Sequence, residues 1–119
     1  MSDIEIVRAP VSLQHLVVIA EGSFGDLLKA VVDVDQGMMA IGGELHADEE
    51  AALLAAGSRQ ADLWGINLYP TEYGAPAWIE FDSMINVRPG QGNRSRGIDD
   101  AAMRERIAQI VDRLVVGAP

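Results

Sequence analysis

Two apolar runs joined by a short polar turn constrain the fold of this chain more than any other feature. Residues 27–34 and 38–45 are rich in Val, Leu, Met and Ile, and Asp35-Gln36-Gly37 separates them. β-Branched residues favour extended structure, and a glycine can take the positive φ that a tight turn requires. The pattern therefore predicts two antiparallel strands that form a β-hairpin around Gly37.

Three more strands and three helices are predicted around this hairpin from short apolar runs, helical spacing of apolar residues and capping residues. The strands are expected at residues 4–7, 63–69 and 78–88, and the helices at residues 13–20, 48–56 and 101–114. Ser12 is the expected N-cap of the first helix, and one apolar stripe is expected on the last, formed by Met103, Ile107, Ile110, Val111 and Leu114. The order β-α-β-β-α-β-β-α predicts an α+β fold with a largely antiparallel sheet of about five strands. At 119 residues the chain is expected to form one domain, residues 1–119.

The last predicted strand has the clearest period of two in the chain. Ile79, Phe81, Ile85 and Val87 are expected on one face, and Glu80, Asp82, Asn86 and Arg88 on the other. One face of this strand would therefore belong to the core, and the other would be polar.

Composition excludes several classes of function. The chain has no Cys, which excludes disulfides, Cys-ligated metals and Cys nucleophiles and suits a reducing compartment. Eighteen acids against nine bases give a net charge of −9, so no extended nucleic-acid surface is expected. The first residues carry acids rather than the positive charge of a signal peptide, and no apolar run approaches the length of a membrane span. We expect a cytoplasmic protein that does not enter the membrane.

A glycine-rich loop at residues 86–97 stands out as a positive island on this acidic chain. It holds three of the nine bases, and no acid occurs between Asp82 and Asp99. Glycine-rich turns and guanidinium groups bind phosphate and carboxylate well. The spacing of Gly92 and Gly97 is that of a phosphate-binding loop, but Ile98-Asp99 follows where Lys-Ser/Thr is required, which excludes a nucleoside-triphosphatase loop.

The leading hypothesis is a binding module for an anionic or phosphate-bearing small molecule. Arg88, Arg94 and Arg96 would clamp the anion, and Asn67, Asn86 and Asn93 would orient it. The alternative is that these arginines pair with the protein's own acids, such as Glu44, Glu80 or Asp82. In that case the loop would be an internal clamp, or a contact between subunits of a homo-oligomer with a structural or regulatory role.

Three long motifs resemble those of a family of small bacterial and archaeal proteins of unknown function. They are Gly-Gly-Glu-Leu-His-Ala-Asp at residues 42–48, Trp-Gly-Ile-Asn-Leu-Tyr-Pro at residues 64–70 and Ile-Asn-Val-Arg-Pro-Gly-Gln-Gly-Asn-Arg-Ser-Arg at residues 85–96. The resemblance covers nearly the whole chain. It implies no activity and no cofactor, and it assigns no role to any residue.

The first of these motifs also raises the alternative of a metal-assisted hydrolase. If residues 44–48 are extended, Glu44, His46 and Asp48 share one face, and Asp82 could add a further oxygen ligand for Zn²⁺, Mn²⁺ or Mg²⁺. Asp48 would be equally well used as the N-cap of the following helix, and His46 as a hydrogen-bond donor to backbone. No metal and no cofactor are included in the leading hypothesis.

Overall fold

The central hairpin forms as predicted in the computed structural model, which describes residues 3–117. Strand β3 (Leu28–Asp33) pairs antiparallel with β4 (Met38–Ile41). Gly37 has a φ of 68° and donates its N–H to the Asp33 carbonyl over 2.9 Å, which closes the turn. The positive φ explains why a glycine is required here.

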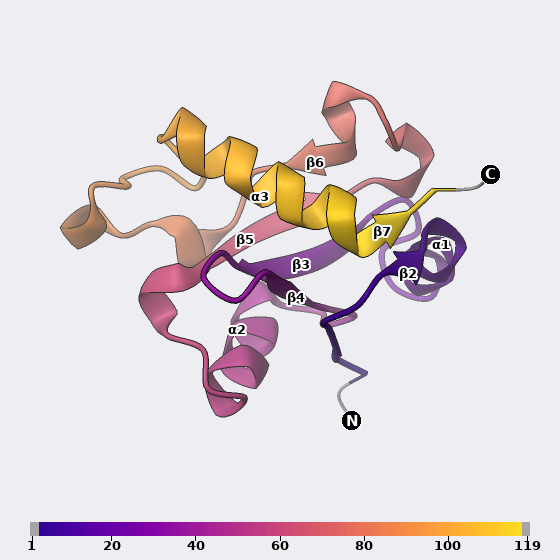
Figure 1. Ribbon diagram of the computed structural model, residues 1–119, viewed down its shortest axis with the longest axis horizontal. Helices are drawn as coiled ribbons and strands as arrows, with labels where there is room; N and C mark the ends of the chain where they lie inside the picture. The colour runs from indigo at the N-terminus through magenta and orange to yellow at the C-terminus, as the bar shows by residue number, and fades with distance from the viewer. Residues whose placement is uncertain (1–2, 118–119) are drawn as a thin grey trace.

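The fold is α+β, with a mostly antiparallel five-stranded sheet and three helices, as the sequence predicts (Figure 1). Within residues 3–117, the other strands are β1 (Glu5–Val7), β2 (Val11–Ser12), β5 (Leu63–Leu68), β6 (Ile79–Glu80) and β7 (Val115–Val116). The helices are α1 (Leu13–Glu21), α2 (His46–Ala55) and α3 (Ala101–Leu114), with short 3-10 helices at Gln60–Asp62, Pro70–Glu72, Pro76–Trp78, Met84–Asn86 and Pro89–Gln91. The main sheet has the order β1-β4-β3-β5-β6. The predicted domain, residues 1–119, extends two residues beyond the described range at each end.

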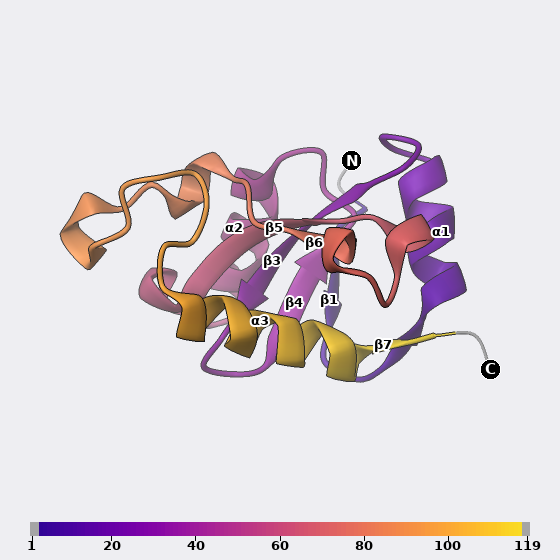
Figure 2. The ribbon, with the colours of Figure 1, turned by 90° about the horizontal axis from the view of Figure 1, so that it is seen from above.

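The three central strands are buried on both faces because helices cover the sheet from both sides. Helices α1 and α3 pack on the face that carries Ala30, Val32 and Ile66, while Leu53 of α2 packs on the face that carries Val31. Figures 1 and 2 show α3 lying across the first face and α2 on the opposite side of the sheet. On β3 and β5, successive side chains point to opposite faces, so the residues that alternate with Ala30, Val32 and Ile66 point toward α2.

Local capping accounts for two of the helix boundaries. Ser12 caps α1 as predicted, with its hydroxyl accepting from the His15 N–H over 3.1 Å, and Asp100 caps α3 by accepting from the Ala102 N–H over 2.9 Å. Helix α2 begins at His46, so the predicted N-cap role of Asp48 is wrong. Over the described part of the chain, every helix is too short or too polar to cross a membrane.

A small second sheet was not expected from the sequence. Strands β2 and β7 pair in parallel, with Val11 opposite Val115 and Ser12 opposite Val116. This pair joins the start of α1 to the end of α3. It therefore holds together the two helices that cover one face of the main sheet.

The predicted fifth strand over residues 78–88 is wrong beyond its first residues. Pairing with β5 stops at Glu80, and Met84–Asn86 form a 3-10 turn. The two isoleucines that alternation places on one face are separated as a result. Ile79 packs into the core under α1 and α3, whereas Ile85 packs into the core under α2.

The side chain of Asn86 takes the place of a strand beside β5. Its Oδ1 accepts from the Gly65 N–H over 2.8 Å, and its Nδ2 donates to the Gly65 carbonyl over 2.9 Å. This is the pair of bonds that a neighbouring strand would make. A Cβ built on Gly65 would lie 2.6 Å from the Cβ of Ser83, so the close approach of this turn to β5 requires glycine.

Two further side chains complete the cover of the β5 edge. His46 Nε2 donates to the Ile66 carbonyl over 2.7 Å, and Arg88 Nη2 donates to the Leu63 carbonyl. Buried backbone groups need partners, and here side chains supply them where strand pairing ends. The edge of β5 is therefore the place where the three motifs noted in the sequence come together.

Candidate functional site

Arg88 is committed to the protein itself. Its guanidinium carbon lies 4.5 Å from the centroid of the Trp64 ring, the geometry of a cation–π contact. Its Nε donates to the Ile85 carbonyl over 2.9 Å and its Nη1 to the Gln60 carbonyl over 3.0 Å, in addition to the bond with Leu63. Partial burial lowers the pKa of the guanidinium below its ordinary value. Arg88 therefore acts as a clamp between the loop and β5.

The amides of Asn86 and Asn93 are committed in the same way. Asn86 is completely buried and is bonded to Gly65. Asn93 donates from Nδ2 to the carbonyls of Asn86 and Gly97 over 2.7 and 2.8 Å, and its Oδ1 accepts from the Asp99 N–H over 2.8 Å. These two residues determine the shape of the loop rather than facing a ligand.

Arg96 and Arg94 differ from Arg88 because most of their N–H groups remain uncommitted. Arg96 donates from Nε to Asp82 Oδ1 over 2.7 Å, and both side chains are about half exposed. No partner of the Arg96 Nη atoms, or of the Arg94 guanidinium, is found within residues 3–117. The internal pairing considered as an alternative is thus present at Arg96, through Asp82, and not with Glu44 or Glu80.

His46 is held at the first position of α2 with one ring nitrogen fixed. A carbonyl can only accept, so the bond to Ile66 requires that Nε2 carries the proton and leaves Nδ1 with a lone pair. Burial lowers the pKa of His46, and the charges of Lys29 and Arg96 lower it further, against the bond to Ile66 and the charge of Asp82. The ring is therefore neutral at neutral pH, with an acceptor nitrogen at Nδ1.

Asn67 lies beside His46 on the face of β5 that points toward α2. Lys29 of β3 and Glu80 of β6 are its partners on the two neighbouring strands. Its Nδ2 donates to Glu80 Oε1 over 2.9 Å and to the Asp82 carbonyl over 3.4 Å. Its Oδ1 is buried and accepts no hydrogen bond from any described residue. A buried acceptor without a donor is uncommon in native proteins.

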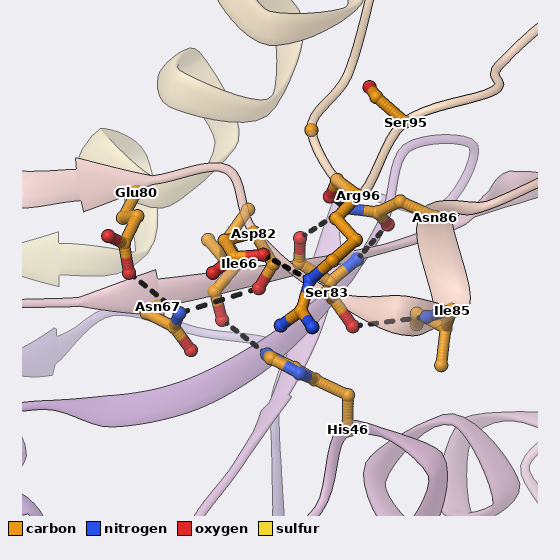
Figure 3. Close-up of polar contacts among 12 residues, drawn as sticks. His46, Ile66, Asn67, Glu80, Asp82, Ser83, Ile85, Asn86, Ser95 and Arg96 are labelled. Atoms are coloured by element: carbon orange, nitrogen blue, oxygen red, sulfur yellow. Dashed lines mark hydrogen bonds and ion pairs between the residues drawn. The ribbon is translucent and has the colours of Figure 1, made fainter.

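These side chains form one group, which we call the polar cluster: Lys29, His46, Asn67, Asp82 and Arg96. They come from β3, the start of α2, β5 and the loops on either side of the Met84–Asn86 turn. Figure 3 shows the Arg96 guanidinium reaching past Asp82 toward the His46 ring, with the Asn67 amide on the same side of β5. The charges of Lys29, Asp82 and Arg96 all act on the pKa of His46.

Tyr69 and Glu80 border the polar cluster. The Tyr69 hydroxyl donates to Glu80 Oε1 over 3.1 Å, the oxygen that also accepts from Asn67. The pKa of Tyr69 is raised by desolvation and by the nearby carboxylate of Glu80. Glu80 is therefore turned toward Tyr69 and Asn67, and it accepts a hydrogen bond from each of them.

The proposed metal ligands do not come together. Residues 44–48 are not extended, because α2 begins at His46. Glu44 and Asp48 line a cavity of about 590 Å³ between α1 and the loop before α2, whereas His46 is turned to the edge of β5. Over residues 3–117 there is no group of three or more His, Asp or Glu side chains that could hold a metal ion.

Lys29 is the member of the polar cluster that the sequence analysis missed. It is the single lysine of the chain and interrupts an apolar strand between Leu28 and Ala30. Its amine lies 5.2 Å from the centroid of the Phe24 ring. A lone lysine in a buried strand is a signal for a site, because burial of an unpaired charge is costly.

The comparisons with known proteins identify a family but no function. The model of a family described as "Protein of unknown function (DUF5674)" matches residues 5–114. Neither the curated proteins nor the solved structures contain a significant match to this chain.

Proposed function

The chain belongs to this family of proteins of unknown function, so its role must be inferred from the site, and we propose that it is a binding module for a small anionic molecule, such as a phosphate ester or a carboxylate. The residues assigned to the anion are Arg96, Lys29 and Arg94. Arg88, Asn86 and Asn93 do not contact the anion, because their polar groups are used within the protein.

The observation that carries the proposal is the geometry of Arg96. Asp82 holds the guanidinium through Nε alone, which orients the fork and leaves the two Nη atoms without a partner in the described structure. A fixed fork of this kind suits two parallel bonds to a carboxylate or phosphate. Pre-orientation also reduces the entropy that binding would otherwise cost.

The surroundings of Arg96 support an anion rather than a cation. Lys29 adds a second positive charge near His46. The imidazole itself is neutral at neutral pH, so it contributes no charge to the site. The first turn of α2 begins there, and its N-cap Leu45 offers no side-chain cap to the free N–H groups. A helix N-terminus with uncapped N–H groups adds to the attraction for an anion.

Isothermal titration with inorganic phosphate, simple phosphate esters and carboxylates tests this proposal. We expect Arg96→Gln to weaken binding of the best anion about 10- to 100-fold, since a charge-assisted bond contributes roughly 1.5–3 kcal/mol. Arg8→Gln is the matched control: it removes the same charge from an exposed position after β1, at the opposite edge of the sheet. The proposal fails if no anion binds the unmodified protein better than the double variant Arg94→Gln, Arg96→Gln.

A further inference from the structure

In addition to its cations, the polar cluster contains two hydrogen-bond acceptors to which no residue of the described range donates. One is Asn67 Oδ1, a buried atom on a residue only 8% exposed. The other is Nδ1 of His46, a residue that is also 8% exposed; this nitrogen is not itself a fully buried atom, but no described residue donates to it. Both residues are thus nine-tenths buried. An anion alone would satisfy the cations and leave the buried Asn67 Oδ1 without a donor.

The orientation of the Asn67 amide follows from its neighbours. The two groups facing Nδ2, Glu80 Oε1 and the Asp82 carbonyl, are both acceptors. Exchanging the amide oxygen and nitrogen would place Oδ1 against a carboxylate, so the orientation is determined by chemistry. Figure 3 shows Oδ1 on the side of β5 where the His46 ring lies.

No described side chain fills the role of donor to Asn67 Oδ1. Lys29 is its cross-strand neighbour, but the amine lies over the Phe24 ring and makes no hydrogen bond to the amide. The Nε2 proton of His46 is used by Ile66. A buried acceptor without a partner is destabilising, so a donor supplied from outside would be favoured at this position.

We infer that the ligand is a hydroxylated anion: its anionic group contacts Arg96 and Lys29, and a hydroxyl close to that group donates to Asn67 Oδ1 or His46 Nδ1. This inference rests on the proposed function and deepens it. A hydroxyl is favoured over an ammonium group as the donor, because at His46 the charges of Lys29 and Arg96 together outweigh that of Asp82 and would repel a second cation. Hydroxy acids and sugar phosphates share this chemistry.

Matched ligands that differ only in the hydroxyl provide the test. Lactate is compared with propionate, and 2-hydroxyethyl phosphate with ethyl phosphate, by isothermal titration with the unmodified protein. We expect the hydroxylated member of at least one pair to bind about tenfold more tightly, the effect of one satisfied buried hydrogen bond. The pair that shows the difference identifies the anionic group as a carboxylate or a phosphate.

Variants and a third ligand separate the alternatives. In Asn67→Ala and, independently, in His46→Gln, the ratio of affinities within the responding pair should fall toward one if that residue accepts from the hydroxyl. Equal affinities within both pairs in the unmodified protein would overturn the inference while leaving anion binding intact. Tighter binding of alanine than of lactate would overturn the choice of hydroxyl over ammonium. Failure of every anion to bind would instead overturn the proposed function.

Discussion

Glu49 gives the sharpest test of the energetics of this fold, because it is a completely buried carboxyl group. It lies in the first turn of α2, where Oε2 accepts from the Gly43 N–H over 3.0 Å and Oε1 has no partner among the described residues. Burial raises the pKa of Glu49 from 4.5 to about 9, against the smaller opposing effects of the Gly43 bond and the Lys29 charge. The folded protein therefore holds Glu49 protonated at neutral pH.

The raised pKa makes stability depend on pH in a defined direction. Between pH 4.5 and 9 the folded state binds a proton that the unfolded state releases, so the free energy of unfolding falls as pH rises. The contribution is fully present below the unfolded pKa and is lost as pH passes through about 9. At about 1.4 kcal/mol per pH unit, raising the pH from 6.5 to 8.5 should cost about 3 kcal/mol.

Urea unfolding of Glu49→Gln across that range measures this contribution. Glutamine keeps the shape and the acceptor for Gly43 but does not titrate, so we expect the variant to lose most of the slope and to exceed the unmodified protein in stability at pH 8.5. Glu105→Gln, an exposed change on α3 with the same loss of charge, serves as the control and should retain the slope. Parallel stability curves for the unmodified protein and Glu49→Gln would refute the assignment of a protonated buried Glu49.

Other predictions concern the edge of β5 and the histidine beside it. Asn86→Ala should lower the free energy of unfolding by about 2–4 kcal/mol in urea titrations, because both polar groups of Gly65 lose their partner. Gly65→Ala should cost about 1–3 kcal/mol, because the added methyl group would contact Ser83 at 2.6 Å, and combining it with Ser83→Gly should recover part of the loss. For His46, ¹⁵N NMR at pH 7 should show a neutral ring protonated at Nε2, and its titration midpoint should lie below that of a model imidazole; an Nδ1-protonated ring would contradict the bond to Ile66.

The parts of the fold that depend only on residues close together in the sequence were predictable from it. The Gly37 turn, the Ser12 cap and the apolar stripe of α3 are local patterns, and each forms as expected. Residues 78–88 do alternate between apolar and polar side chains, but most of the segment does not pair with β5 as a strand, so the prediction failed there. Asn86 satisfies Gly65 through a side chain 21 residues away, and no local pattern records such a bond.

The candidate site shows the same limit. Closeness in sequence groups the arginines of residues 86–97 into one clamp, yet Arg88 binds backbone carbonyls, Arg96 pairs with Asp82, and the Arg94 guanidinium has no partner in the described range. The partner of each arginine depends on where β5 lies relative to the loop. That relation is set by tertiary packing, so a positive island in the sequence could locate the region but could not assign its residues.

The parallel β2–β7 pair has a consequence for how this protein folds during synthesis. Val11 and Val115 become neighbours only after the ribosome has released the segment that carries β7. The hairpin of β3 and β4 can form much earlier, since its contacts are local. The layer made by α1 and α3 must therefore close last, and until then the apolar face beneath it is exposed to chaperones and to other nascent chains.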